Sequence, residues 1–160
     1  MDKFARIMSS VNSAAALVAG VAVLIISILA GVEAIARNLF DYSFEGIYAI
    51  SIFLMLYSIL LGSAYCFEKE GHIRVEILLE RVSEKYRRIL YIIGYLVSAG
   101  FVAVLGWKGF QITARAYKYD YLTMTTVQVP EAYVNVVIPV GSLLMLLTLL
   151  VKLAERIKNR

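Results

Sequence analysis

Long apolar stretches alternate with short segments that hold the charged residues of the chain. Four stretches lack Asp, Glu, Lys and Arg: residues 8–32, 46–67, 89–107 and 132–151, which are 25, 22, 19 and 20 residues long. An α-helix rises about 1.5 Å per residue, so each stretch can cross roughly 30 Å of hydrocarbon. Lipid cannot satisfy backbone polar groups, and the stretches lack the alternation of barrel strands. The pattern predicts an all-α integral membrane protein with four transmembrane helices.

The four spans are expected to form a single membrane domain. They should cover about residues 10–36, 46–67, 87–108 and 132–152, all within one four-helix domain of residues 1–160. The apolar stretch of the first span, residues 8–32, follows Lys3 and Arg6 and precedes the small-x-small tripeptide at 34–36, as the apolar part of a signal peptide would. Its apolar run exceeds the roughly 7 to 15 residues of a secretory signal, so we expect an uncleaved helix.

The segment between the second and third spans is polar but carries one apolar face. Residues 68–88 include eleven charged residues. Apolar side chains recur among them at steps of three and four, at Val75, Leu78, Leu79, Val82 and Tyr86. This spacing predicts an amphipathic helix over about residues 73–83 that lies in the membrane interface near lipid headgroups. The alternative is a docking strut for another membrane subunit.

The distribution of basic residues predicts the orientation in the membrane. Of 16 Lys and Arg residues, twelve lie before the first span, between the second and third spans, or after the fourth. The other two connecting segments hold only Arg37, Lys108, Arg115 and Lys118. By the positive-inside rule, both termini and the middle segment are cytoplasmic.

The composition excludes several classes of protein. The chain is 61% hydrophobic and 18% charged, whereas soluble domains are about 45 to 50% apolar and about 25% charged. A net charge of +4 would suggest nucleic-acid binding in a soluble protein, but here we attribute it to topology and expect no nucleic-acid partner. The single cysteine, Cys66, and single histidine, His72, cannot build a disulfide, a redox pair, a zinc cluster or paired haem ligands. We find no nucleophile with a base, and expect no enzyme activity, cofactor or metal.

Charged residues flank the spans but do not enter their centres. Glu33 and Arg37 are one turn apart at the outer end of the first span, where they can neutralise each other, and Glu45 enters the second span from the same side. Their simplest role is interfacial, with the side chains reaching water; the alternative is an ion-paired contact to a partner or an ion path. A proton-coupled carrier usually needs an ionisable residue within the membrane, and this chain has none there.

Small and aromatic residues predict packing faces and an interfacial belt. Small residues occur four apart in the pairs Ala16 and Gly20, Ser27 and Gly31, Ser58 and Gly62, and Gly94 and Ser98. In the fourth span, Pro139 removes a backbone hydrogen bond and Gly141 lies nearby, so we expect a kink. Aromatic residues gather near residues 107–133, which is typical of an interfacial belt, although such a surface could also receive an external protein.

Several short motifs resemble one family, the small membrane subunits of tripartite ATP-independent periplasmic (TRAP) transporters. The motifs are Arg-Asn-Leu-Phe at 37–40, Ser-Phe-Glu at 43–45, Leu-Gly-Ser-Ala at 61–64, Gly-His-Ile-Arg-Val-Glu at 71–76 and Pro-Val-Gly at 139–141. The family often has tryptophan near Phe44, a second acid at Gly46 and aspartate at Glu76. The residues found here at 44 and 76 keep the aromatic and acidic character.

The resemblance implies a scaffold subunit of a sodium-coupled importer of organic acids, either carboxylates or sulfonates. A large multi-span carrier subunit would move the substrate by an elevator-type mechanism, and a periplasmic substrate-binding protein would deliver it, at the bacterial inner membrane. The small subunit would contact that carrier and membrane lipids, with no catalytic, substrate-binding or metal residue of its own. Candidate structural or partner-interface residues are Glu33, Arg37, Glu45, Gly62, Gly71, His72, Arg74, Glu76, Pro139 and Gly141.

Two other interpretations of four short spans stay open at this point. A haem-free membrane anchor of a respiratory enzyme would need no histidine pair. A small homodimeric multidrug carrier would have a similar length but would need a carboxylate embedded in the membrane.

Overall fold

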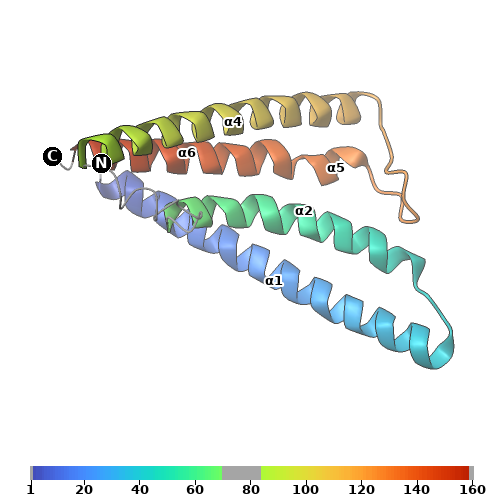
Figure 1. Cartoon of the computed structure of the whole chain (residues 1–160). Coiled ribbons are helices and arrows are strands. Elements are labelled where there is room, and N and C mark those ends of the chain that lie inside the picture. Colours follow the sequence, from blue (N-terminus) through green and yellow to red (C-terminus); the bar gives the residue numbers. More distant parts are fainter. Residues whose placement is uncertain (1, 70–83, 159–160) are drawn as a thin grey trace.

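Four long helical segments account for most of the chain. The structure is a computed structural model, and it describes residues 2–69 and 84–158. The helices are α1 (Asp2–Phe40), α2 (Glu45–Glu68), α4 (Glu84–Lys118), α5 (Glu131–Asn135) and α6 (Val137–Lys158) (Figure 1). Four segments are long and apolar enough to span a membrane: Ala5–Phe40, Glu45–Glu68, Ile89–Lys118 and Glu131–Ala154. The expectation of an all-α protein with four transmembrane helices is therefore confirmed.

Two parts of the expected architecture are not covered by these helices. The interfacial helix predicted over about residues 73–83 lies outside the described residues. The sidedness of the membrane remains a prediction from the basic residues. On that prediction, we call the end that holds both termini the inner end, and the end that holds the α1–α2 and α4–α5 connections the outer end (Figure 1).

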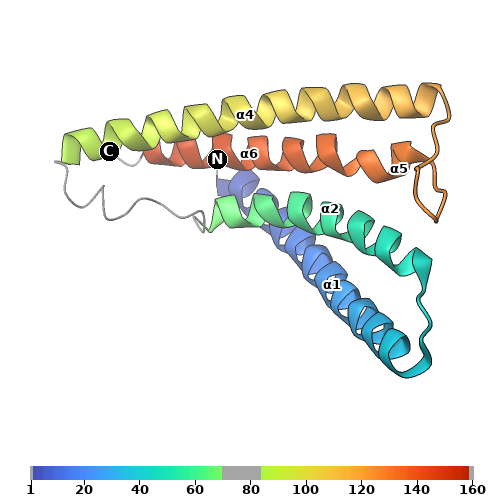
Figure 2. The ribbon, with the colours of Figure 1, turned by 45° about the vertical axis from the view of Figure 1, so that its right-hand side comes forward.

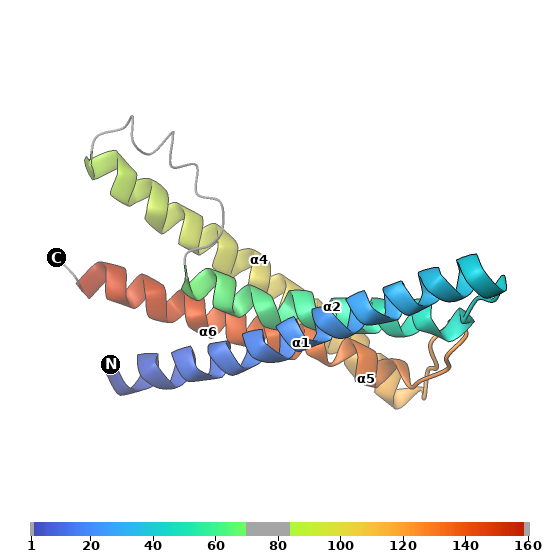
Figure 3. The ribbon, with the colours of Figure 1, turned by 90° about the horizontal axis from the view of Figure 1, so that it is seen from below.

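The helices form a single layer rather than a closed bundle. They pack mainly in the spatial order α1, α2, α6, α4, so the last helix lies between α2 and α4 (Figures 1 and 2). Seen from below, the helices cross one another near the middle of the layer, and α4, α6 and α1 spread apart toward the end that holds both termini (Figure 3). In the most apolar window of each span, only 6% to 33% of the residues are buried. Most of the apolar surface of the layer is therefore available to lipid or to other membrane proteins.

Glycines occur where neighbouring helices approach most closely. At the α1–α2 contact, a methyl group added to Gly62 would lie 3.5 Å from Ala19 Cβ. At the α2–α6 contact, a methyl group on Gly141 would lie 2.9 Å from Leu60 Cβ and 3.1 Å from its backbone oxygen. Small residues let helix backbones approach closely within membranes, where lipid is as apolar as the side chains. Gly141 is thus a contact that a larger residue cannot occupy without movement of α2.

The α4–α6 contact uses two glycines that the four-residue spacing did not single out. A methyl group on Gly106 would lie 3.0 Å from Ser142 Cβ, and one on Gly109 would lie 2.9 Å from Ile138 Cβ. By contrast, nothing lies within 4 Å of such a group at Gly20, Gly31 or Gly94. Of the small residues expected at packing faces, those three therefore point away from the helix contacts within the described chain.

The α6 helix holds the apolar core together. The buried cluster draws on α2, α4 and α6 and consists of Leu60, Ala64, Val102, Val137, Met145 and Leu149. Leu149 is only 2% exposed. Helix α6 is central because it packs against α2 on one side and against α4 on the other.

The helix ends are shaped by residues with unusual backbone conformations. Asp41 follows α1 with φ 51°, and Asp120 follows α4 with φ 49°; aspartate enters this left-handed region more readily than most residues. At the end of α4, Tyr121 N donates to Ala116 O at 3.1 Å, the long bond of a Schellman motif. This motif ends α4 after Lys118, so the helix is about ten residues longer at this end than the span expected to end near residue 108.

The fourth span is interrupted near its outer end. Helix α5 ends at Asn135 and α6 begins at Val137. Pro139, four residues after Asn135, has no N–H to donate to the Asn135 carbonyl. The helical path still continues, since Val136 N donates to Ala132 O at 3.0 Å and Val140 N donates to Val136 O at 3.3 Å.

We expect the Gly141→Ala substitution to destabilise the layer by about 1–3 kcal/mol, the usual cost of overpacking a tight contact. The added methyl group would meet the Leu60 backbone, which cannot rotate away as a side chain can. Unfolding in mixed detergent micelles would measure the change. The matched control is Gly20→Ala, where the methyl group enters open space. Equal stability of the two variants would contradict the proposed contact.

Candidate functional site

The first cluster of predicted residues lies at the outer turn between α1 and α2. Arg37 and Glu33 form an ion pair, with 2.8 Å between Nη2 and Oε1. Ser43 Oγ donates to Glu33 Oε1 at 2.6 Å, and the Phe44 backbone N–H donates to Glu33 Oε2 at 3.0 Å. Both carboxylate oxygens of Glu33 therefore accept hydrogen bonds. We call Glu33, Arg37, Ser43 and Phe44 the outer cluster.

The outer cluster closes the turn rather than presenting a reactive group. Phe44 precedes the first residue of α2, so the carboxylate of Glu33 ties the end of α1 to the beginning of α2. The Glu33 side chain is 16% exposed, whereas that of Arg37 is 66% exposed. The guanidinium group is thus the more exposed partner of the ion pair, although Arg37 Nη2 also lies 3.5 Å from Ser43 Oγ in the turn.

Glu45 lies near the outer cluster but takes no part in the hydrogen bonds that join Glu33 to Arg37, Ser43 and Phe44. Glu45 is the first residue of α2, where an acidic side chain is favourable at the positive helix end. It lines an open pocket of about 560 Å³ together with Glu33, Arg37 and Tyr48. This pocket lies between the outer parts of α1 and α2.

The remaining predicted residues do not join the outer cluster. Gly62 and Gly141 lie at the contacts of α2 with α1 and α6, and Pro139 lies in the first turn of α6 beside Gly109. The residues predicted in the middle segment, Gly71, His72, Arg74 and Glu76, lie outside the described residues.

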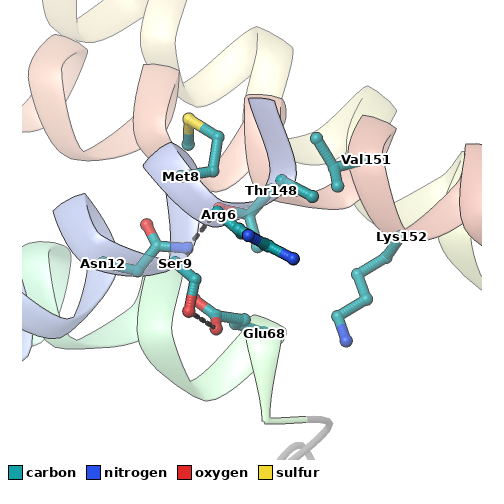
Figure 4. A pocket seen from close by; sticks show the side chains of 9 residues that line it. Arg6, Met8, Ser9, Asn12, Glu68, Thr148, Val151 and Lys152 are labelled. Carbon is teal, nitrogen blue, oxygen red and sulfur yellow. Dashed lines mark hydrogen bonds between the residues drawn. The ribbon is translucent and has the colours of Figure 1, made fainter. Parts of the chain in front are cut away.

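A second cluster, which the sequence analysis missed, joins three helices near the inner end. Asn12 of α1 donates through Nδ2 to Glu68 Oε2 of α2 at 2.8 Å and to Thr148 Oγ1 of α6 at 2.9 Å (Figure 4). Ser9 Oγ donates to Glu68 Oε1 at 2.7 Å. Thr148 Oγ1 in turn donates to Leu144 O, one turn earlier in its own helix. We call Ser9, Asn12, Glu68 and Thr148 the inner cluster.

The inner cluster is the more deeply buried of the two. Asn12 is 0% exposed and Thr148 is 2% exposed. Each amide hydrogen of Asn12 has an acceptor on a different helix, so this one side chain fixes the position of α1 relative to α2 and α6. Within the described part of the chain, Asn12 Oδ1 has no hydrogen-bond partner.

A usable signal for the inner cluster was present in the sequence. Asn12 lies within the first uncharged stretch and Thr148 lies within the fourth, while Glu68 directly follows the second. Asn12 and Thr148 are uncharged, so they do not interrupt the apolar stretches. Asn and Thr side chains nevertheless often form hydrogen bonds between transmembrane helices.

Neither cluster has the composition of a catalytic or metal centre. Across residues 2–69 and 84–158, no group of three His, Cys, Asp or Glu side chains is placed to hold a metal ion. What the two clusters can do chemically is join helices: the outer cluster joins α1 to α2, and the inner cluster joins α1, α2 and α6.

Comparisons with known proteins identify similar chains. A family model described as "Tripartite ATP-independent periplasmic transporters, DctQ component" matches residues 24–159. The sialic acid TRAP transporter small permease protein SiaQ of Vibrio cholerae serotype O1 is 27% identical over 108 residues. That alignment covers 66% of this chain and 59% of the relative, so the matched part spans about three fifths of the relative's length.

We expect Asn12→Ala to lower the free energy of unfolding by about 1 kcal/mol, since it removes two hydrogen bonds between transmembrane helices and each contributes roughly 0.6 kcal/mol on average. The substitution removes two donors and leaves Glu68 with a single donor from Ser9. Unfolding in micelles is again the measurement. The control is Ser27→Ala, because the Ser27 hydroxyl bonds only to Val23 O of its own helix. A loss no greater than that of the control would contradict the role of Asn12.

We expect Glu33→Ala to accelerate hydrogen exchange at the Phe44 amide, because the substitution removes the acceptor of that N–H. Exchange followed by mass spectrometry on peptides from residues 40–48 would measure it. Asn38→Ala is the matched control, since the Asn38 side chain donates to Ala34 O within α1 and makes no bond across the turn. Unchanged exchange in the Glu33 variant would show that the carboxylate does not hold the turn.

Proposed function

The chain belongs to the DctQ component family of TRAP transporters, and from this membership we propose that it is the scaffold for the large carrier subunit. It is a small permease subunit and a multi-pass protein of the bacterial inner membrane. The observation that carries the scaffold proposal is the single open layer of helices, in which most of the apolar surface has no partner within the described chain.

An elevator-type mechanism gives such a layer a physical role. One part of the transporter must stay fixed in the bilayer while another part slides across it with the substrate. A flat layer of four long helices widens the fixed part and increases the apolar area that resists displacement into water. The inner and outer clusters support this role, because they restrict movement of α1 against its neighbours.

The distribution of charge favours a scaffold over a route for the substrate. No Asp, Glu, Lys or Arg occupies the centre of a span, and the two clusters that contain a carboxylate lie toward the ends of the layer. Intramembrane substrate and ion sites usually rely on polar groups near the midplane. We therefore propose that the sodium ion and the organic acid bind on the large subunit and not on this chain.

The partners and the substrate class follow from the family rather than from the geometry. We propose that the complex contains a large multi-span carrier subunit and receives substrate from a periplasmic binding protein. Its substrate would be an organic acid, either a carboxylate or a sulfonate. The relative from Vibrio cholerae is named for sialic acid, which is a carboxylate, and this supports the carboxylate class. Family membership does not favour the respiratory anchor or the multidrug carrier.

We expect the tagged chain, extracted from its native membrane in mild detergent, to carry with it a larger multi-span protein in constant proportion. Mass spectrometry of the purified material would identify that protein. Vesicles containing both proteins, the binding protein and a sodium gradient should take up the organic acid, whereas vesicles containing this chain without the larger protein should not. Recovery of the chain alone or with a redox enzyme, or uptake by this chain without the larger protein, would reject the scaffold proposal.

A further inference from the structure

A pocket opens beside the inner cluster, between the ends of α1, α2 and α6. Its volume is about 240 Å³. Arg6 contributes from α1, Lys152 from α6 and Glu68 from α2, while Met8 and Val151 supply apolar wall (Figure 4). The pocket thus combines two cationic side chains from different helices with a hydrocarbon surface.

The two cations outnumber the carboxylates among the described residues that line the pocket. Glu68 is the one carboxylate in this described lining, and both of its oxygens already accept hydrogen bonds, from Ser9 and Asn12. The ion pair found within the described chain joins Arg37 and Glu33 at the opposite end of the layer. The described lining of the pocket therefore carries a net charge of about +1 when Arg6, Lys152 and Glu68 are ionised.

The position of the pocket and its two cationic side chains favour an anionic ligand that carries a phosphate group. It lies at the end of the layer predicted to face the cytoplasm, at the level where lipid headgroups meet the helix ends. A guanidinium group can offer two parallel donors to a phosphate, and an ammonium group acts beside it as a point charge. A singly charged phosphodiester would balance the net charge of the pocket, and the walls formed by Met8 and Val151 could accept the attached apolar portion.

We propose that this pocket binds a phosphate-bearing group, with Arg6 and Lys152 as its ligands. The group has two sources in a bacterial membrane: the headgroup of an anionic phospholipid, and free phosphate from the cytoplasm. The proposal does not depend on the scaffold role, because it rests on the lining of the pocket alone. Bound there, the ligand would join α1 to α6, two helices that otherwise touch each other little.

The test uses the chain purified together with any membrane partner, freed of lipid in a maltoside detergent that contains no phosphate. Phosphatidylglycerol is added in one arm and inorganic phosphate in the other, and the midpoint of thermal unfolding is followed, since a ligand of the folded state raises it. We expect the double variant R6Q/K152Q to weaken binding about fivefold for each charge removed, or about 25-fold in total.

Two further variants separate charge from folding. The variant K108Q/R115Q removes the same charge from exposed positions on the outer part of α4 and should bind as the unaltered chain does. The exchange variant R6K/K152R keeps both charges and should retain binding within a few fold.

The outcomes decide both the site and its source. A response to phosphatidylglycerol alone that R6Q/K152Q removes supports the site and assigns it to a lipid headgroup; an equal response to inorganic phosphate supports the site and assigns it to free phosphate. No response in either arm overturns the proposal. It is also overturned if R6Q/K152Q and K108Q/R115Q respond alike, or if R6K/K152R loses binding together with R6Q/K152Q.

Discussion

Close approach of helix backbones is the interaction on which this structure depends. Within a bilayer, apolar side chains gain little by leaving lipid for one another, so helices associate through tight packing and a few hydrogen bonds. Glycine occurs in all three contacts of the layer, as Gly62 toward α1, Gly141 toward α2, and Gly106 with Gly109 toward α6. These glycines mark the successive contacts in the spatial order α1, α2, α6, α4.

Hydrogen bonds complement that packing at the two ends of the layer. Near the inner end, Asn12 distributes its two donors between α2 and α6. At the outer turn, Glu33 accepts from Arg37 of its own helix and from Ser43 and Phe44 of the segment that leads into α2. Because the central contacts are apolar and close while the polar contacts lie toward the ends, helix α1 is restrained at two separated points. A helix that is restrained at two separated points resists both sliding and rotation, which agrees with the scaffold role proposed above.

The spans and the family could be predicted from the sequence, because both depend on patterns of neighbouring residues. Uncharged stretches give the four helices, and short motifs such as those at residues 37–40 and 139–141 give the resemblance that the family match confirms. The spatial order of the helices was beyond this reasoning, because small residues four apart do not reveal their partners: Gly62 meets Ala19, while Gly20 and Gly94 face open space. The inner cluster was missed for a related reason, since Asn12 and Thr148 are 136 positions apart and neither is charged.

The place of α6 between α2 and α4 has a consequence for how the chain is made. Synthesis delivers α1 and α2 first, and these two can pair in the membrane at once, because they are neighbours in the finished layer. Helix α4 arrives next and packs chiefly on α5 and α6, which the ribosome has not yet produced. The contacts that α4 makes with α5 and α6 can therefore form only after the fourth span has been released. A ribosome that stops before residue 131 would therefore leave α4 without the helices that make most of its contacts in the described layer.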